Sequence, residues 1–291
     1  MSEAYTIPGI RQPGPVGALP AAPAVCMLAL MDIDRISACT YAVRNESLDR
    51  AFGLVSASGF RKVDLWGGPP NYADDPSLCD ISAIRDRAAK YGLRVANLGT
   101  YPGRNLLEVG LEAEMRVMQW AIDNAVTLGA RSIRVHPGTG EDPAIVPRLV
   151  PFFVQSARYA EKRQVFLGME NHAGSLAGNP EAIMSLVAAV GSPWFGILFE
   201  PANLMHGKVD YRDAYRVFRG SIVHIHVKDS RWVDGTYERT MLGEGEIDYA
   251  WVIRALEADG YRGDYALEYE IEDRFPIDDG LPKWLDHFRR L

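Results

Sequence analysis

Cysteine is scarce in this chain, and its pattern excludes two classes of protein. There are three cysteines, Cys26, Cys39 and Cys79. Their number is odd and their spacing matches no metal-binding motif, which argues against a disulfide-stapled fold and against a cysteine-held zinc site. We therefore expect reduced, structural thiols and a cytoplasmic protein.

Two further absences limit the partners of the protein. The 31 Lys and Arg residues are outnumbered by 38 Asp and Glu residues, so the net charge is -7. A non-specific nucleic-acid binder needs a basic surface, and this balance argues against one. No apolar run reaches the roughly 20 residues that a membrane helix needs. The sequence therefore predicts a protein that binds neither nucleic acid nor membrane.

The amino-terminal stretch differs in composition from the rest of the chain. Residues 1–33 are rich in Pro, Gly and Ala, and residues 21–31 form an apolar patch. The patch contains Pro23 and lacks a preceding basic cluster, which distinguishes it from a secretory signal. We expect a non-catalytic extension over 1–33, or a start codon assigned too early, with Met27 or Met31 as the true start.

From residue 34 onward, short apolar segments alternate with longer helical ones. The expected strands are 36–41, 62–66, 94–98, 131–136, 165–170, 195–200, 222–227 and 264–270. The expected helices are 47–58, 81–91, 107–128, 144–163, 180–190, 211–218, 249–259 and 282–290. Such alternation is typical of a parallel sheet buried on both faces. Eight units favour a closed barrel over an open sheet, which would also need an early Gly-rich phosphate loop. The sequence therefore predicts a single-domain (β/α)8 TIM barrel over residues 34–291.

Acid and histidine side chains stand at or near the carboxyl ends of the last four expected strands. They are Glu170, Glu200, His226 and Glu268. In such barrels, functional groups gather at that end of the strands. A single acid there is more often a loop carboxylate than a ligand, but four groups at matching depth indicate one shared site. Three carboxylates and one imidazole suit Mn²⁺ or Mg²⁺, with Co²⁺ and Zn²⁺ as alternatives.

Further polar side chains share a face with these groups, because side chains along a strand alternate with a period of two. His172 follows Glu170 at that spacing, and His224 and Lys228 flank His226 in the same way. The candidate substrate-binding residues are His136, His172, Asn203, His224, Lys228 and Trp66.

Three of these interpretations have alternatives. His136 is either a structural histidine or a substrate contact. Trp66 and Tyr101, at the ends of the second and third expected strands, form either a hydrophobic wall of the pocket or ordinary packing. Asp229 is more plausible as a carboxylate that orients its neighbours than as a ligand.

Five motifs give the chain a family resemblance. They are Glu170-Asn-His172, Pro201-Ala-Asn203, His224-Ile-His226-Val-Lys-Asp229, Leu242-Gly-Glu-Gly-Glu-Ile-Asp248 and Leu267-Glu-Tyr-Glu270. Over about residues 35–290, the sequence resembles the sugar phosphate isomerase/epimerase family of xylose-isomerase-like barrels. The resemblance implies a divalent metal held by Glu170, Glu200, His226 and Glu268. It also implies proton transfer by Glu170 and Glu268 on opposite sides of the substrate, and it makes a homo-oligomer or a partner subunit an open expectation.

The chain departs from related patterns in two ways. The position of Glu200 is usually Asp in the family that the chain resembles, so the longer side chain puts the geometry of the metal in question. Apurinic endonucleases share this barrel but need a trinuclear zinc site with histidines from the early strands. This chain has no histidine before His136, so we do not expect a DNA-repair enzyme.

The chemistry expected of the site follows from charge. Removing a proton α to a carbonyl places negative charge on the oxygen, and a metal at that oxygen stabilises the enediolate by several kcal/mol. With Glu170 and Glu268 moving the protons, we expect a metal-dependent isomerase or epimerase of a small sugar, keto-sugar or polyol. The alternative is a lyase on the same site, either an inosose-type dehydratase or an enzyme that cleaves a 3-keto glycoside by β-elimination. A binding or partner subunit without catalysis is a third, weaker hypothesis.

Overall fold

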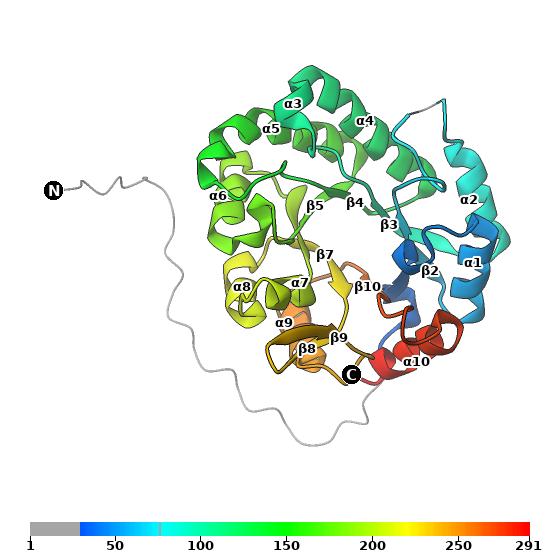
Figure 1. The fold of residues 1–291 in the computed structure, drawn as a ribbon. Coiled ribbons are helices and arrows are strands. Elements are labelled where there is room, and N and C mark those ends of the chain that lie inside the picture. The colour runs from blue at the N-terminus through cyan, green and yellow to red at the C-terminus, as the bar shows by residue number, and fades with distance from the viewer. Residues whose placement is uncertain (1–29, 76) are drawn as a thin grey trace.

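A computed structural model describes residues 30–75 and 77–291. Eight parallel strands close into a barrel in the order β1-β10-β7-β6-β5-β4-β3-β2, and helices surround it as an outer ring (Figure 1). The predicted (β/α)8 barrel is therefore confirmed. The barrel strands are β1 (Ile36–Cys39), β2 (Lys62–Trp66), β3 (Arg94–Gly99), β4 (Ser132–Val135), β5 (Phe166–Glu170), β6 (Phe195–Phe199), β7 (Ile222–Val227) and β10 (Tyr265–Leu267). The expected extension over 1–33 lies almost entirely outside the described residues.

The helices begin and end where local side chains satisfy the free backbone groups. Ser47, Asp80, Asn179 and Asp248 each accept a hydrogen bond from a backbone N–H in the first turn of the helix that follows. The main helices are α1 (Leu48–Ala57), α2 (Ile81–Lys90), α4 (Leu111–Leu128), α5 (Val146–Arg163), α6 (Pro180–Val190), α8 (Tyr211–Phe218), α9 (Tyr249–Ala258) and α10 (Ile277–Arg289). No helix in the described part of the chain is both long enough and apolar enough to cross a membrane.

The core lies on both sides of the barrel wall. Every residue of β1, β4 and β6 is buried, because the helices cover the outer face and side chains fill the interior. The interior also holds polar residues, among them Asp64 on β2, Asn97 on β3 and Ser132 on β4. These polar residues lie below the site described in the next subsection.

Two helices differ from the prediction. The segment expected to be one helix over 107–128 is divided into α3 (Leu106–Val109) and α4, because Gly110 between them has a φ of +83°, a value that only glycine adopts readily. The last helix begins at Ile277 rather than at residue 282 and contains Pro282 in its interior. Its buried apolar face, which includes Trp284 and Phe288, stabilises the helix despite the hydrogen bond that proline cannot form.

The segment after β7 forms a hairpin that the sequence did not predict. Its strands are β8 (Ser230–Val233) and β9 (Thr236–Arg239), which pair antiparallel. Asp229 holds the loop that follows, since its carboxylate accepts the backbone N–H groups of Ser230, Gly243, Gly245 and Ile247. Asp229 therefore orients backbone of the loop rather than the side chains of the candidate ligands.

Candidate active site

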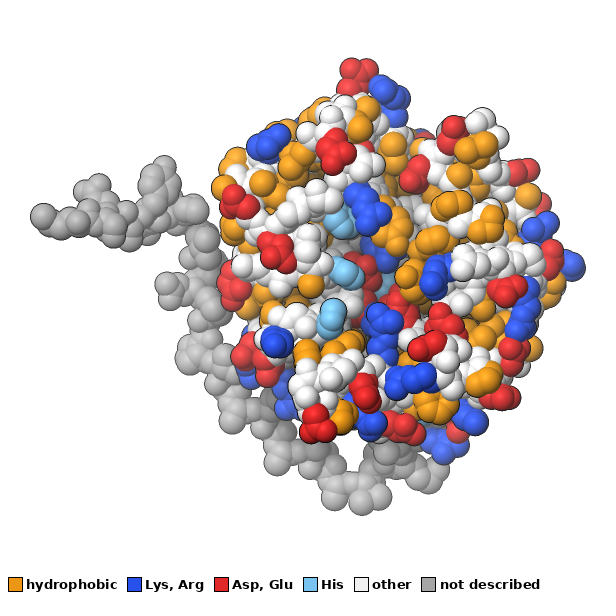
Figure 2. All heavy atoms as spheres, in the orientation of Figure 1, with side chains coloured by type: hydrophobic (Ala, Val, Ile, Leu, Met, Phe, Trp, Pro, Cys, Tyr) orange, Lys and Arg blue, Asp and Glu red, His pale blue; other side chains and the backbone are white. Residues whose placement is uncertain are grey.

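A cavity of about 220 Å³ opens at the carboxyl ends of the barrel strands. Histidine and charged side chains gather around a hollow in the middle of this face (Figure 2). Four glutamates, two histidines and one lysine line the cavity, together with the arginines Arg104, Arg134 and Arg239. This strongly polar lining suits a hydroxylated or charged small molecule better than an apolar one.

The structure brings the four predicted metal ligands together. Glu170 ends β5, Glu200 directly follows β6, His226 lies in β7 and Glu268 directly follows β10. Each offers one ligand atom, and these four atoms lie within 4.8 Å of one another. The Nδ1 atom of His226 is 3.1 Å from Glu170 Oε1, 3.5 Å from Glu268 Oε2 and 3.7 Å from Glu200 Oε2. Three carboxylates thus converge on one imidazole nitrogen.

Two asparagines fix Glu200 in this cluster. Asn171 donates from Nδ2 to the Glu200 carbonyl at 2.7 Å and accepts the Glu200 N–H at 2.8 Å, which ties the end of β5 to the end of β6. Asn203, on the short helix α7 (Pro201–His206), donates to Glu200 Oε2 at 2.8 Å. The longer side chain at this position is therefore held at both its backbone and its carboxylate. Asn203, a predicted substrate contact, also lines the cavity.

The charges of the cluster are strongly coupled. Burial alone would raise the pKa of Glu170, but Arg134, 2.9 Å from Glu170 Oε2, and His226 lower it well below its usual value. Burial raises the pKa of Glu200 to about 8 against the attraction of Lys228, and the neighbouring Glu268 raises it further. The crowding of like charge and the donor set of three carboxylate oxygens and one nitrogen fit a hard divalent cation.

Lys228 lies among the carboxylates instead of standing apart from them. Its Nζ is 2.5 Å from Glu200 Oε1, 2.7 Å from Glu270 Oε2 and 3.1 Å from Glu268 Oε2. Burial would lower the pKa of Lys228, but the three carboxylates raise it well above its usual value. Lys228 is thus a fixed ammonium at the wall of the cavity, where we expected a substrate contact.

His136 and His172 both line the cavity. The Nδ1 atom of His136 is buried and has no hydrogen-bond partner in the described part of the chain. Burial lowers the pKa of His136 to about 4, and Arg104 and Arg134 act in the same direction. His136 is therefore a neutral imidazole with a free ring nitrogen. His172 is exposed at the rim, and its Nδ1 lies 2.7 Å from the Ala173 carbonyl oxygen.

Two predicted substrate contacts do not line this cavity. His224 precedes His226 by two residues on β7 and so lies one layer deeper in the barrel, where its Nε2 is 2.7 Å from Asp64 Oδ2. Trp66 is half-buried beside the cavity and donates from its indole nitrogen to the Tyr101 hydroxyl at 3.2 Å. It is Tyr101 that reaches the cavity wall.

The sequence did not predict several charged residues of the site, namely Arg104, Arg134, Arg239 and Asp64. Arg134 and Asp64 each interrupt a short apolar strand, and a charged residue at such a buried position needs a partner. A charge within an apolar run is therefore the sequence pattern that could have indicated these two residues. Arg239 ends the unpredicted hairpin and lies 3.2 Å from Glu270 Oε2. No pattern in the sequence places that hairpin over the cavity.

The chain is similar in sequence to a family of barrel proteins and to several known relatives. A family model described as a xylose isomerase-like TIM barrel matches residues 52–291. The chain is 26% identical over 259 residues to the uncharacterized protein MJ1311 of Methanocaldococcus jannaschii, a match that covers 83% of this chain and 86% of that protein. Over 114 residues the chain is 28% identical to an L-ribulose-5-phosphate 3-epimerase of Escherichia coli. This matched region covers 39% of this chain and 39% of the epimerase. The relatives thus include a sugar epimerase.

A solved structure supports the fold. The structure described as an AP endonuclease, family 2, from Brucella melitensis superposes with a TM-score of 0.70 and 22% identity over 88% of this chain and 99% of that one. At this identity the likeness concerns the fold alone. This chain has no histidine before His136, so the early strands offer no imidazole for an additional zinc ion.

Proposed function

Because this chain belongs to the xylose isomerase-like TIM barrel family, we propose that it is a divalent-metal-dependent isomerase or epimerase of a small sugar, keto-sugar or related polyol. The observation that carries the proposal is the convergence of Glu170, Glu200, His226 and Glu268 beside a polar cavity that the three glutamates line. The partial similarity to an L-ribulose-5-phosphate 3-epimerase supports the same class of reaction. These four side chains would hold the ion, with Mn²⁺ or Mg²⁺ as the best match to their oxygen-rich donor set.

The residues of the chain divide the work of proton transfer. A bound divalent cation supplies positive charge where negative charge develops on the carbonyl oxygen of the substrate. Glu170 is kept ionised by Arg134, which is the form that can take a proton from the carbon next to the carbonyl. Glu268 directly follows β10, which is separated from β5 by β6 and β7 in the barrel, so it can deliver a proton to another face of the substrate. Two opposed groups produce inversion at a carbon, and one group alone produces an aldose–ketose exchange.

Solvent exchange tests this proposal. The protein is incubated with keto-sugars and Mn²⁺ in deuterated water, and we expect deuterium next to the carbonyl with all other atoms of the substrate retained. Glu170→Gln and Glu268→Gln should each reduce the exchange rate by about 10²-fold or more, the range of general acid–base catalysis. The control is Glu244→Gln, an exposed glutamate outside the cavity.

Two results would contradict the proposal. Unchanged exchange in both glutamine variants would exclude the two glutamates as proton carriers. Loss of water or of a larger group from the substrate would instead identify the lyase, which uses the same proton abstraction but expels a β leaving group.

A further inference from the structure

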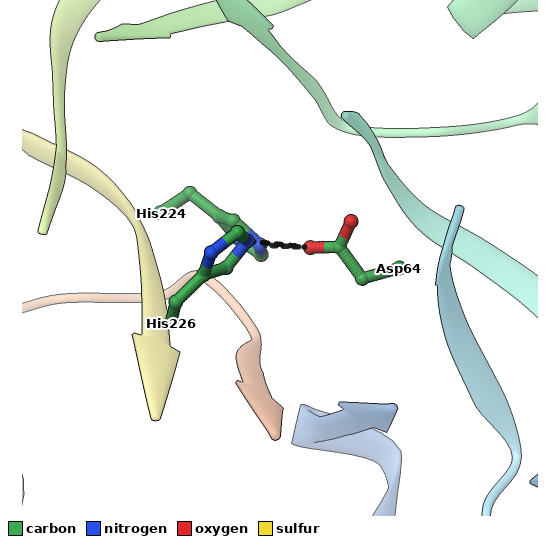
Figure 3. Close-up of side chains that lie close together, drawn as sticks. All are labelled: Asp64, His224 and His226. Atoms are coloured by element: carbon green, nitrogen blue, oxygen red, sulfur yellow. Dashed lines mark hydrogen bonds and ion pairs between the residues drawn. The ribbon is translucent and has the colours of Figure 1, made fainter. Parts of the chain in front are cut away.

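Below the cluster, a buried carboxylate contacts the side of His226 that faces away from the cavity. Asp64 projects from β2 toward His224 and His226, which both come from β7 (Figure 3). Its Oδ2 atom is 2.7 Å from His224 Nε2 and 3.3 Å from His226 Nε2. Asp64 is only 1% exposed. The role proposed above for the four ligands does not involve this residue.

Asn97 sets the orientation of Asp64 in the barrel interior, and Ser132 forms a hydrogen bond with Asn97 but not with Asp64. Ser132 Oγ donates to Asn97 Oδ1 at 2.7 Å, which leaves the Asn97 amide nitrogen facing Asp64. That nitrogen donates to both oxygens of Asp64, at 3.1 and 3.2 Å. The register of β2 and β3 shifts between Val63 and Asp64, so that Asp64 and Asn97 become direct partners. An irregularity of this kind re-aims a side chain.

The geometry around Asp64 determines which protons the imidazoles carry toward it. Both of its oxygens accept hydrogen bonds from the Asn97 amide nitrogen, and Oδ2 also lies within hydrogen-bond distance of the Nε2 atoms of His224 and His226. A carboxylate oxygen accepts hydrogen bonds, so both histidines present Nε2–H to it. No lysine or arginine pairs with Asp64 in the part of the chain that the structure describes. Such a buried charge is expensive, and ordinary packing does not need it.

The two nitrogens of His226 therefore face two different sets of carboxylates. Nε2 is directed at Asp64, while Nδ1 is directed at Glu170, Glu200 and Glu268. A neutral imidazole that gives its one proton to Asp64 presents a lone pair at Nδ1. This is the form in which histidine binds a cation.

We propose that Asp64 is a positioning residue, which fixes His226 as the Nε2–H tautomer and so aims the Nδ1 lone pair at the divalent cation. The inference rests on the proposed function, because it assigns His226 to that ion. Loss of such a carboxylate behind a ligating histidine reduces metal affinity by about 10- to 100-fold.

An Asp64→Asn substitution gives a sharp test, because Asn97 dictates how the introduced amide must turn. The Asn97 nitrogen needs an acceptor, so the carbonyl oxygen of the introduced amide would face Asn97 and its NH₂ group would face the imidazoles. That NH₂ would donate to Nε2 of His226 and favour the opposite tautomer, with the proton on Nδ1, where the ion should bind. D64N should therefore weaken metal binding at least as much as D64A, although D64N preserves the volume of the side chain.

The experiment is a titration of the metal-free full chain with Mn²⁺, followed by the EPR signal of the free ion. We compare the wild type, D64N, D64A and S132A, and we also measure the thermal midpoint of each metal-free protein. Ser132→Ala is the matched control, since Ser132 belongs to the same buried chain of hydrogen bonds but does not touch Asp64. We expect one Mn²⁺ per chain, a 10- to 100-fold loss of affinity in D64N and D64A, and a change of less than about threefold in S132A.

The outcomes separate this inference from the proposed function. If D64N binds Mn²⁺ within threefold of the wild type, Asp64 does not position His226 and the inference is overturned. It is also overturned if the loss of Mn²⁺ affinity only follows the fall in thermal midpoint and is largest in D64A, because Asp64 would then have a structural role alone. Two Mn²⁺ per chain, one of them lost in D64A, would make Asp64 a ligand instead of a positioning residue and would also overturn it. Tight Mn²⁺ binding without any isotope exchange overturns the proposed function alone, whereas a wild type that binds no divalent ion overturns both.

Discussion

Arg134 determines the charge state of Glu170. Its guanidinium is buried, donates to the carbonyl oxygens of Gly99 and Thr100, and lies over the ring of Tyr101 at 4.2 Å. The remaining nitrogen, Nη1, donates to Glu170 Oε2 at 2.9 Å. This leaves Oε1 of Glu170 for the side that faces His226. One arginine thus keeps a half-buried glutamate ionised and turned toward the cluster.

The first prediction concerns this ion pair. Arg134→Met should lower the free energy of unfolding by about 3–5 kcal/mol, because it leaves the Glu170 carboxylate buried without its cation. Arg104→Met is the matched control, because Arg104 lines the same cavity and also lies over the Tyr101 ring, at 4.9 Å. Arg104 is exposed, so its replacement should lower the free energy of unfolding by less than about 0.5 kcal/mol. Urea unfolding of the metal-free proteins measures both values, and equal values for the two variants would contradict the role given to Arg134.

The second prediction concerns pH and His136. Its pKa of about 4 in the folded state lies below the usual 6.5, so the unfolded chain binds the proton more readily between these values. The contribution of the neutral His136 side chain to the free energy of unfolding is fully present above pH 6.5 and is lost as the pH falls toward 4. Between pH 7 and pH 5, the wild type should lose about 2 kcal/mol more than His136→Gln. Parallel stability curves for the two proteins would show that His136 titrates normally.

At the scale of single residues, the candidate ligands were easier to predict from the sequence than the residues that contact them from behind. Glu170, Glu200 and Glu268 could be predicted because each stands at a strand end, where a parallel barrel gathers its functional groups. Asp64 and His224 could not be paired in advance, since 160 residues separate them and their contact depends on the closure of the barrel. The tautomer proposed for His226 depends in the same way on its contact with Asp64 across the barrel.

The β8–β9 hairpin is the element that completes the cavity wall. It rests on α7 through two hydrogen bonds, from the Trp232 indole to the Met205 carbonyl at 3.3 Å and from the Tyr237 hydroxyl to the Ala202 carbonyl at 3.1 Å. Arg239 at its end lines the cavity and contacts Glu270. The hairpin and the loop after it are held from below by Asp229.

The third prediction tests that support. Asp229→Asn replaces an acceptor of four backbone N–H groups with an amide that has only one oxygen, and it should cost about 1–3 kcal/mol. Hydrogen exchange of the backbone over 243–247 should become faster while β5 and β6 stay protected. Asp234→Asn at the exposed hairpin tip is the control, because asparagine tolerates its φ of +48°. If both variants exchange alike, Asp229 does not hold the loop.

Elements were predictable where periodicity and local chemistry agreed. The barrel strands alternate with helices as expected, because short β-branched runs and capped amphipathic segments leave few alternatives. The hairpin was missed since residues 230–242 are polar and lack a strong turn pattern apart from Asp234-Gly235. The early start of α10 was not predicted, because proline is common at the first position of a helix and Pro282 therefore indicated a start there. Burial of Trp284 and Phe288 stabilises the longer helix instead.

At the scale of the whole molecule, the barrel is closed by contacts between distant parts of the chain. β1 pairs with β10, and Arg35, just before β1, reaches the far end of the chain. Its guanidinium contacts Glu257 at 2.6 Å and donates to the carbonyl oxygens of Tyr261 and Gly263. The Met31 N–H also donates to the Arg289 carbonyl at 2.9 Å.

The fourth prediction follows from this closure. A chain that begins at Met31 should keep the thermal midpoint and the metal affinity of the full chain, because it retains both of these contacts. A chain that begins at Ile36 loses them and should be less stable by at least about 2 kcal/mol. Thermal unfolding of the two shortened proteins measures the difference. Loss of folding in the longer of the two would show that residues 1–30 are required for the barrel.

The position of Lys228 has a consequence for the folding of the metal-free protein. A positive charge that is part of the chain lies within 3.1 Å of Glu200, Glu268 and Glu270, so the repulsion among these acids is already offset when the barrel closes. If the proposed divalent ion binds here, the barrel should therefore fold before the ion arrives and should stay folded after the ion is removed.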